Sequence, residues 1–386
     1  MEAERRFCRF GVCDTAGALL ALQNRSADAN STTPPSLAPE VLMSYLDRDR
    51  AAPYSWEALG DALIKAGRRD GARDALARAV ALGPTSAPTL LLAADFQFDD
   101  GHEDQGLRLT SRALHVGGDA QLYDAAFTML AAKKVAAARV PEALAMDRPA
   151  TLALLRRLLH PEFLDINGAR SVWTWALGRG YVDEAVARDY TNALLGHKLS
   201  REAWDDWVSY VAPGNVERNG EGYPATNRIF NGGFERESAG GVFDWRIDPR
   251  AGVKAAFDSE HLPEGKRSLR LTFDGTENVG DVGVLQQVYL APGHYVFRAH
   301  MRSQNLKTDQ GVAFRVSFDP SPSQLDVTTH ALRGTVDWTS EAAEFDAPNE
   351  GGVVSVRVTR KPSLKFDKLV SGQVWIDAVT IEPASP

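Results

Sequence analysis

The feature that most constrains the fold of this chain is a pattern of small and large residues that recurs after 34 residues. Within 53–86 the pattern places small side chains among larger apolar ones at the three-to-four spacing of amphipathic helices. The defining positions are Trp56, Leu59, Gly60, Ala72, Leu76, Ala79 and Pro84. Small residues let two antiparallel helices approach closely, Gly67 permits the turn between them, and Pro84 ends the second helix. The segment therefore predicts a helical hairpin.

A second unit follows in phase from Ala87, although Thr110 replaces a large apolar residue. Its matching positions are Leu90, Ala93, Ala94, Gly101, Gly106 and Ala113. Together the two units resemble tetratricopeptide repeats, which implies a helical superhelix whose groove binds a protein partner or peptide. Helical periodicity covers 37–213, with 120–165 out of register and another hairpin at 169–196, so we expect four to five helix pairs. The tryptophans at 173, 175, 204 and 207 recur at helical spacing and are expected to pack between helices.

The residue pattern of the sequence changes after residue 213, from helical periodicity to short alternating runs. Residues 214–226 contain three glycines and a proline, which is typical of a linker. From 227 to 386, short runs of alternating apolar and polar residues are bounded by Gly, Pro, Asp and Asn. These runs are 228–235, 253–258, 268–273, 284–290, 294–302, 312–318, 341–345, 353–359 and 373–381. Nine strands without intervening helices predict an antiparallel β-sandwich.

Six ordered motifs in this half are similar to those of jelly-roll carbohydrate-binding modules of families four, nine and twenty-two, which are galactose-binding-like folds. The motifs are Asn231-Gly232-Gly233-Phe234-Glu235, Phe243-Asp244-Trp245, 265–271, 292–297, Asp337-Trp338-Thr339 and 374–381. Asp244 departs from the pattern, because the family has a glycine there. The resemblance implies a jelly roll that binds a polysaccharide or oligosaccharide, although such folds also serve as spacers or protein-binding domains.

Alternation along the strands sorts the side chains of this half into two faces. Polar or aromatic residues on the outward side are candidate glycan ligands, because guanidinium groups and amides bind hydroxyls and aromatic rings stack on sugars. The candidates are Trp245, Gln287, Tyr289, Arg298, His300, Arg302, Arg315 and Trp338. Arg270 and Arg357 are also expected to point outward. If the arginines share a face, they suit an acidic or heavily hydroxylated glycan; the alternative is an ordinary solvated face paired with carboxylates.

The family resemblance also implies a structural calcium ion between the first and last strands. By position its ligands would be the carboxylates of Glu235 and Asp377, with main-chain carbonyls near Lys266 completing an oxygen shell. The alternative is that both carboxylates cap strand ends without a metal.

The composition and the absence of known catalytic motifs argue against several classes of function. The net charge is −8, and from residue 227 onward there are 18 Lys and Arg against 21 Asp and Glu, so neither half is a basic nucleic-acid-binding domain. Only Cys8 and Cys13 are present, no run reaches the roughly 20 apolar residues of a membrane span, and no HExxH, Gly-x-Ser-x-Gly or phosphate-binding glycine loop occurs. We therefore expect no catalysis; a glycoside hydrolase is the weaker alternative.

Residues 1–36 have two open interpretations. Arg5, Arg6 and Arg9 precede a short apolar run at 16–22, and Ala27-Asp28-Ala29 fits a cleavage pattern, but Asp14 and Arg25 interrupt a signal peptide. The segment is either a targeting signal or a disordered or mis-started N-terminus. The domain resemblance favours a periplasmic or cell-envelope location. Taken together, the sequence predicts a non-catalytic accessory or scaffold protein of bacterial polysaccharide assembly or export, or alternatively a protein scaffold whose sandwich binds no sugar.

Overall fold

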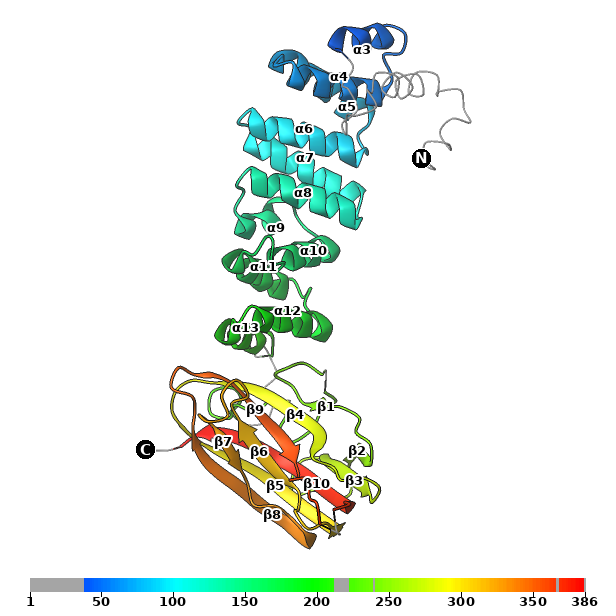
Figure 1. Cartoon of the computed structure of the whole chain (residues 1–386). Coiled ribbons are helices and arrows are strands. Elements are labelled where there is room, and N and C mark those ends of the chain that lie inside the picture. The colour runs from blue at the N-terminus through cyan, green and yellow to red at the C-terminus, as the bar shows by residue number, and fades with distance from the viewer. Residues whose placement is uncertain (1–37, 212–221, 239, 366–367, 385–386) are drawn as a thin grey trace. The chain divides into compact units, whose positions relative to one another are not determined.

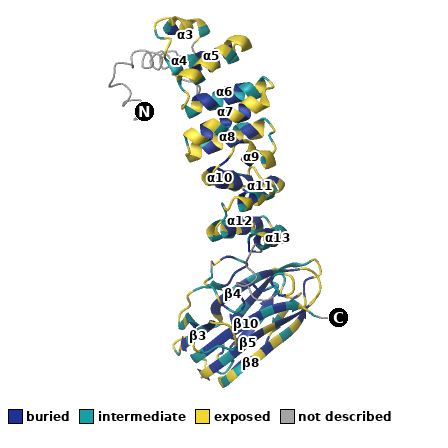
Figure 2. Cartoon of the chain, turned by 180° about the vertical axis from the view of Figure 1, so that it is seen from behind, coloured by how far each residue is buried: buried dark blue, intermediate teal, exposed yellow. Residues whose placement is uncertain are grey.

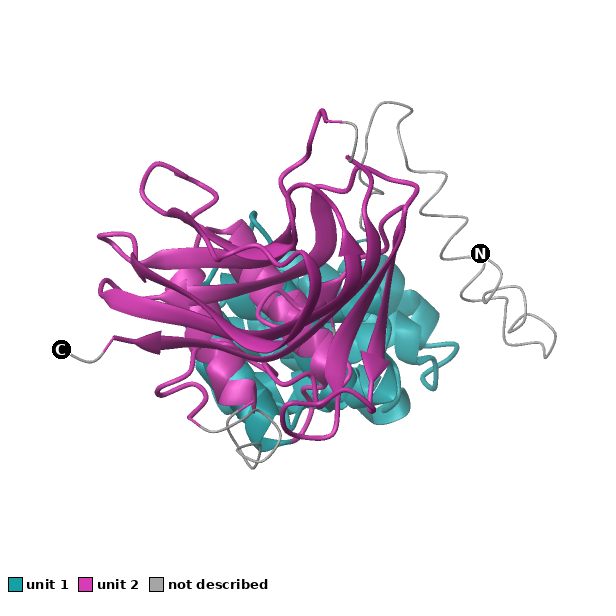
Figure 3. Cartoon of the chain, turned by 90° about the horizontal axis from the view of Figure 1, so that it is seen from below, with its two compact units in different colours: residues 1–179 teal, residues 180–386 magenta. Residues whose placement is uncertain are grey.

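The computed structural model describes residues 38–211, 222–238, 240–365 and 368–384. Within them, helices come first and antiparallel strands follow, which confirms the predicted order of a helical-repeat part and a β-sandwich (Figure 1). The chain divides into two compact units, 1–179 and 180–386 (Figure 3). None of the described helices is long and apolar enough to cross a membrane. The segment at 1–36, including both cysteines, lies outside the described residues.

The first unit is a succession of antiparallel helix pairs. The helices are α3 (Pro39–Leu46), α4 (Pro53–Lys65), α5 (Arg69–Leu82), α6 (Ala87–Asp99), α7 (Glu103–Val116), α8 (Ala120–Ala132), η2 (Ala137–Arg139), α9 (Val140–Ala143), α10 (Arg148–Leu158) and α11 (Ile166–Gly178). Gly60 on α4 faces Leu76 on α5 so closely that a Cβ there would lie 2.6 Å from the Leu76 Cδ2 atom. The predicted small positions are therefore where paired helices touch. The pair that begins with α8 departs from the pattern, because the short η2 and the four-residue α9 stand where a long second helix would follow.

The second unit begins with another helix pair, α12 (Glu184–Gly196) and α13 (Ser200–Val211). Aromatic side chains of α13 pack on residues that precede the first strand: Trp204 lies 5.2 Å from Phe243 and Trp207 lies 5.4 Å from Phe230, between ring centroids. The spacing predicted that these two tryptophans pack between helices. They also pack on residues outside the helices. The contacts group α12 and α13 with the strands, whereas sequence texture predicted a boundary at 214–226; most of that segment lies outside the described residues.

Two five-stranded sheets form the sandwich of the second unit. The strands are β1 (Arg246–Ile247), β2 (Val253–Asp258), β3 (Ser268–Asp274), β4 (Asp281–Leu290), β5 (His294–Lys307), β6 (Ala313–Ser317), β7 (Asp326–Thr328), β8 (Gly334–Asp346), β9 (Gly352–Thr359) and β10 (Ser371–Pro383). Sheet A has the order β1-β4-β9-β6-β7, and sheet B has the order β2-β3-β10-β5-β8. The neighbouring strands within both sheets pair antiparallel. The predicted sandwich is confirmed.

The core of the sandwich lies between the two sheets. Phe297 of β5 and Phe314 of β6 meet there at 4.9 Å between ring centroids, and neither is exposed. Buried and exposed residues alternate along β5 and β8 (Figure 2). Each strand therefore offers its alternate residues to the outer faces of the sandwich, where the candidate site residues lie.

Candidate functional site

The candidate glycan ligands lie on both sheets and do not form a single surface. Arg298, His300 and Arg302 are on β5 of sheet B. Gln287 and Tyr289 are on β4, and Arg315 is on β6, all in sheet A. Arg298 and Arg315 are thus on different sheets, so the expected surface containing both is not present.

The outer face of sheet A carries a polar band that crosses all five strands. Strand register places Arg246 beside Leu285, Leu285 beside Arg357, Arg357 beside Arg315, and Arg315 beside Thr328. A second row runs in parallel through Gln287, Ser355, Ser317 and Asp326. We call these two rows the sheet A band. Directly opposite residues share a face, so their side chains lie together.

Asp319 ties the middle of the sheet A band together. Its carboxylate accepts hydrogen bonds from the Ser317 hydroxyl at 2.8 Å, the Ser355 hydroxyl at 2.6 Å and the Arg357 Nη2 atom at 2.6 Å. Burial alone would raise the pKa of Asp319, but the bonds from the two serines and the charge of Arg357 outweigh it and hold the pKa below its ordinary value. The carboxylate is therefore charged and fixes the donors around it.

The remaining arginines of this face are also paired with carboxylates. Arg315 makes a two-atom contact with Asp326, at 2.7 and 2.8 Å, which lowers the pKa of Asp326 through the hydrogen bond from the guanidinium. Arg250 donates to Asp281 at 2.9 Å, and a shallow hollow of about 40 Å³ lies beside this pair. Arg250 also donates to the Pro249 carbonyl at 3.1 Å, and a guanidinium with its five N–H groups keeps some of them for a ligand. The face is therefore rich in donors yet balanced in charge.

The outer face of sheet B is more closed. Trp375 of β10 is 1% exposed, and its Nε1 atom donates to Asp258 at 2.9 Å. Arg302 lies over that ring, with its Cζ atom 5.3 Å from the ring centroid, and Arg298 contacts Glu382 at 3.5 Å. His300 sits beside Asp377 in the strand register. Arg298, His300 and Arg302 thus lie against residues of the neighbouring strand β10. The Trp375 ring under Arg302 is buried and not open to a ligand.

The two candidate stacking tryptophans have different environments. Trp245 is fully buried (0% exposed), packs against Phe234 at 5.0 Å and donates from Nε1 to the Asn231 carbonyl at 3.0 Å. A sugar cannot stack on a ring that the core covers, so Trp245 is not a ligand residue. Trp338 on β8 is partly exposed. The alternation of apolar and polar residues could not distinguish the buried Trp245 from the partly exposed Trp338, because Trp245 lies in a loop that folds back on the sandwich.

Asp377 and Glu235, the predicted calcium ligands, lie near one another beside β10, the central strand of sheet B. Asp377 is 1% exposed, and its Oδ2 atom has no hydrogen-bond partner. Burial, followed by the nearby charges of Glu264 and Glu235, raises the pKa of Asp377 to about 7. Glu235 accepts hydrogen bonds from the main-chain nitrogen atoms of Lys266 at 2.6 Å and Arg267 at 3.3 Å.

These residues fit a calcium ion in their chemistry. A hard cation takes oxygen ligands, and it would compensate a buried carboxylate oxygen that has no partner. No group of three or more His, Cys, Asp or Glu side chains in the described ranges has the geometry of a metal site, so main-chain carbonyls would have to complete the shell. Asp377 and Glu235 are the residues that would hold the ion.

Ser355, a member of the sheet A band, and Asp319, which binds three of its residues, were missed among the predicted ligands. Asp319 follows β6, and Ser355 lies on β9 beside Gln287. Their signal in the sequence is weak, because a single Asp in a turn and a single Ser in a strand are common. Only the register of three strands brings them together.

Comparisons with known proteins found distant matches among solved structures. No protein-family model and no curated protein matches the sequence. Among solved structures, the CBM22-1 xylan-binding domain of Xyn10C from Paenibacillus barcinonensis is 16% identical with a TM-score of 0.28 and covers 40% of this chain and 92% of its own. The CBM22-1 and GH10 modules of xylanase 10B from Clostridium thermocellum, complexed with xylohexaose, are 15% identical with a TM-score of 0.30 and cover 42% of this chain and 29% of their own.

For the helices, the TPR domain of P58(IPK) is 15% identical with a TM-score of 0.26 and covers 52% of each chain. These low identities and TM-scores say nothing about ligands. The architecture itself rests on the helix pairs and on the strand order described above. Within its described residues, the chain is a series of antiparallel helix pairs followed by a β-sandwich of two five-stranded antiparallel sheets.

Proposed function

We propose that the protein is a non-catalytic accessory or scaffold protein that binds a glycan on the outer face of sheet A and a protein through its helical repeats. The observation that carries the glycan proposal is the sheet A band, in which guanidinium, hydroxyl and amide groups from five strands share one face. Bacterial polysaccharide assembly or export is the process in which such a combination would serve.

The charge balance of the band points to a neutral, hydroxyl-rich glycan. Arg357 pairs with Asp319, and Arg315 pairs with Asp326, so neither guanidinium offers an uncompensated charge to a uronate. The free N–H groups still donate to hydroxyl oxygens, and the carboxylates accept from hydroxyl groups. The acidic glycan considered from the sequence is therefore the less favoured ligand.

Docking of a protein is supported by a hollow of about 520 Å³ between α8 and α10 in the first unit. Its floor includes Tyr123 and Phe127, which stack at 6.2 Å, and Arg156 and Arg157 lie among the lining residues. Because Arg157 is already paired with Asp124, the apolar floor beside Arg156 suits an apolar peptide that carries an acidic side chain. This hollow also supports the second candidate function, a protein scaffold whose sandwich binds no sugar.

Affinity electrophoresis of the full chain tests the glycan proposal. We expect xylan or another neutral polysaccharide in the gel to retard the wild type, and the retardation to persist as salt rises, because no net charge is involved. Replacing Arg315 and Gln287 together by Ala should weaken binding at least tenfold, since two rows of the band lose donors. Arg298→Ala, on sheet B, is the matched control and should bind as the wild type does.

Three results would contradict the proposal. Absence of retardation in every polysaccharide would favour the protein scaffold. Retardation only by acidic polysaccharides, and only at low salt, would show the wrong ligand class. Loss of binding in Arg298→Ala, with binding intact in the double variant, would move the site to sheet B. A thermal melt of each variant checks that the fold is kept.

A further inference from the structure

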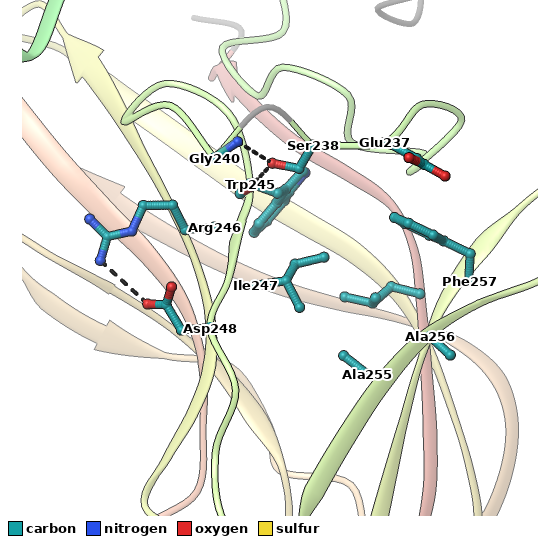
Figure 4. Close-up of a pocket in the computed structure, with 11 residues that line it drawn as sticks. Glu237, Ser238, Gly240, Trp245, Arg246, Ile247, Asp248, Ala255, Ala256 and Phe257 are labelled. Carbon is teal, nitrogen blue, oxygen red and sulfur yellow. Dashed lines mark hydrogen bonds and ion pairs between the residues drawn. The ribbon is translucent and has the colours of Figure 1, made fainter. Parts of the chain in front are cut away.

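A separate cleft lies at the open edge of the sandwich, between the segment that leads into β1 and strand β2 (Figure 4). Its volume is about 640 Å³, within the range of small-molecule pockets, roughly 300–1,000 Å³. The residues that shape it are Glu237, Trp245, Ile247, Ala255, Phe257 and Leu269. Arg246, a member of the sheet A band, also lines the cleft, so the two surfaces meet at β1.

The cleft exists because the two sheets are not closed against each other at this edge. Strand β1 has only two residues, and the facing β2 carries the small side chains Ala255 and Ala256. Deeper in the cleft, Trp245 and Leu269 are buried and make a rigid floor. The Ser238 hydroxyl donates to the Trp245 carbonyl and accepts from the Gly240 nitrogen at 3.0 Å, which fixes the upper wall.

Two side chains at the mouth of the cleft, Phe257 and Glu237, can contact a ligand. Phe257 projects from β2 toward Trp245 and Ile247 (Figure 4), and it is only partly buried. The Arg267 Cζ atom lies 3.9 Å from the centroid of the Phe257 ring, so one ring face is covered and the ring is held in place. Glu237 is exposed, lies above Phe257 in Figure 4, and makes no ion pair within the described part of the chain.

The other charged residues of the cleft do not compete for Glu237. Arg246 pairs with Asp248 at 3.6 Å, and both side chains point away from Phe257 (Figure 4). The cleft therefore combines an apolar floor, one aromatic ring with one face already covered, and one unpaired carboxylate. A sugar ring has the complementary features: apolar C–H groups that pack on the ring of Phe257 and on Ile247, and hydroxyls that donate to a carboxylate.

We infer that this edge cleft binds one neutral sugar ring, with its C–H face on Phe257 and Ile247 and a hydroxyl donating to Glu237. The choice of a sugar rests on the proposed glycan-binding function, but Phe257, Ile247 and Glu237 are not residues of the sheet A band. Ile247 and Arg246 of β1 both line the cleft, and Arg246 also belongs to the band, so the two surfaces are adjacent. A glycan lying on sheet A could thus place one residue in the cleft.

Saturation-transfer difference NMR on the full chain tests the inference, with neutral methyl glycosides of glucose, galactose, mannose and xylose as probes. At least one probe should receive saturation from the wild type. Glu237→Gln keeps the size of the side chain and removes its charge, so we expect affinity to fall several-fold. Phe257→Ala should weaken binding at least tenfold. Glu350→Gln, an exposed residue in the turn after β8, is the matched control and should leave binding unchanged.

The outcomes separate the cleft from the proposed function. Absence of saturation for all four glycosides overturns the cleft inference, while polysaccharide retardation by the band would still support glycan binding. Saturation that survives both cleft variants but is lost in the Arg315 and Gln287 double variant also overturns it, because the sugar would then lie on sheet A. Glu237-dependent saturation of N-acetyl-lysine amide in place of the glycosides would show a cation site and contradict the inference.

Discussion

Asp377 is a residue whose burial and ionisation oppose each other. Its folded pKa of about 7 lies above the ordinary value of 3.8, so the folded state holds the proton more tightly than the unfolded chain. The resulting penalty is absent below about pH 4, grows as pH rises between the two values, and is complete above about pH 7. A shift of about three pKa units corresponds to about 4 kcal/mol.

We therefore predict that Asp377→Asn stabilises the protein when a chelator is present. Thermal melts at pH 8 should show a higher melting temperature for the variant than for the wild type, and the difference should vanish near pH 4. Calcium should raise the melting temperature of the wild type, because it binds the folded state, but not that of the variant.

Glu235→Gln serves as the comparison for Asp377→Asn. It should also weaken the response to calcium, yet it should not stabilise the chelated protein, because Glu235 accepts hydrogen bonds from Lys266 and Arg267. If millimolar calcium and chelator leave the wild-type melt unchanged, the metal proposal fails. If Asp377→Asn lowers the melting temperature in chelator, the carboxylate stabilises the fold in another way.

For single residues of the candidate site, the alternation of side chains along a strand predicts only whether a residue points outward or toward the core. Gln287, Arg315 and Arg357 do point outward, as the period of two indicates. Alternation does not say which sheet a strand joins, so it could not separate Arg298 from Arg315. It also does not say what covers an outward residue, and Trp245 was misassigned because its loop returns to the core. These relations depend on contacts between residues far apart in the chain.

At the scale of secondary-structure elements, the helix pairs depend on small residues at their crossings. A Cβ at Gly60 would lie 2.6 Å from Leu76 Cδ2, and a Cβ at Gly106 would lie 2.8 Å from Phe98 Cδ2. We predict that Gly60→Leu and Gly106→Leu each lower the free energy of unfolding by on the order of 1–3 kcal/mol, because the crossings become overpacked. Thermal or denaturant melts of the full chain measure the change.

Gly178→Leu is the control for these two substitutions. Gly178 is also helical, at the end of α11, but a Cβ there has no neighbour within 4 Å. Leucine should therefore be neutral or slightly stabilising, since it has the higher helix propensity. Equal melting temperatures for all three variants would show that the small residues do not mark the helix crossings.

Element prediction succeeded where the periodic pattern is long and failed where the element is short. Eight of the nine predicted strand runs correspond to strands of the sandwich. The run at 228–235 is not a strand, because Asn231 and Phe234 have φ values of 52° and 54°, which break an extended conformation. Strands β1 and β7, with two and three residues, are too short to show alternation. Their positions follow from pairing with β4 and β6.

On the scale of the whole molecule, the helices and strands do not separate where the sequence texture changes. The helical period continues through α13, which places the sequence boundary after residue 213. However, α13 directs Trp204 and Trp207 toward Phe243, Phe230 and Tyr223, and the Trp207 Nε1 atom donates to the Tyr223 hydroxyl at 3.1 Å. Arg236 also forms an ion pair with Glu184 of α12 at 2.8 Å. Periodicity reveals the type of an element, but not the partner against which its apolar face packs.

These contacts predict what limited proteolysis will do. Protease should cut first within 213–226, because the segment is rich in glycine and polar residues. The two fragments should nevertheless co-elute in size-exclusion chromatography under native conditions, since burial of the aromatic cluster holds α13 on the sandwich. Replacing Trp204 and Trp207 together by Ala should let the nicked fragments separate, whereas Trp56→Ala, in the first unit, should not. Separation of the wild-type fragments without denaturant would show that the sandwich folds independently of α12 and α13.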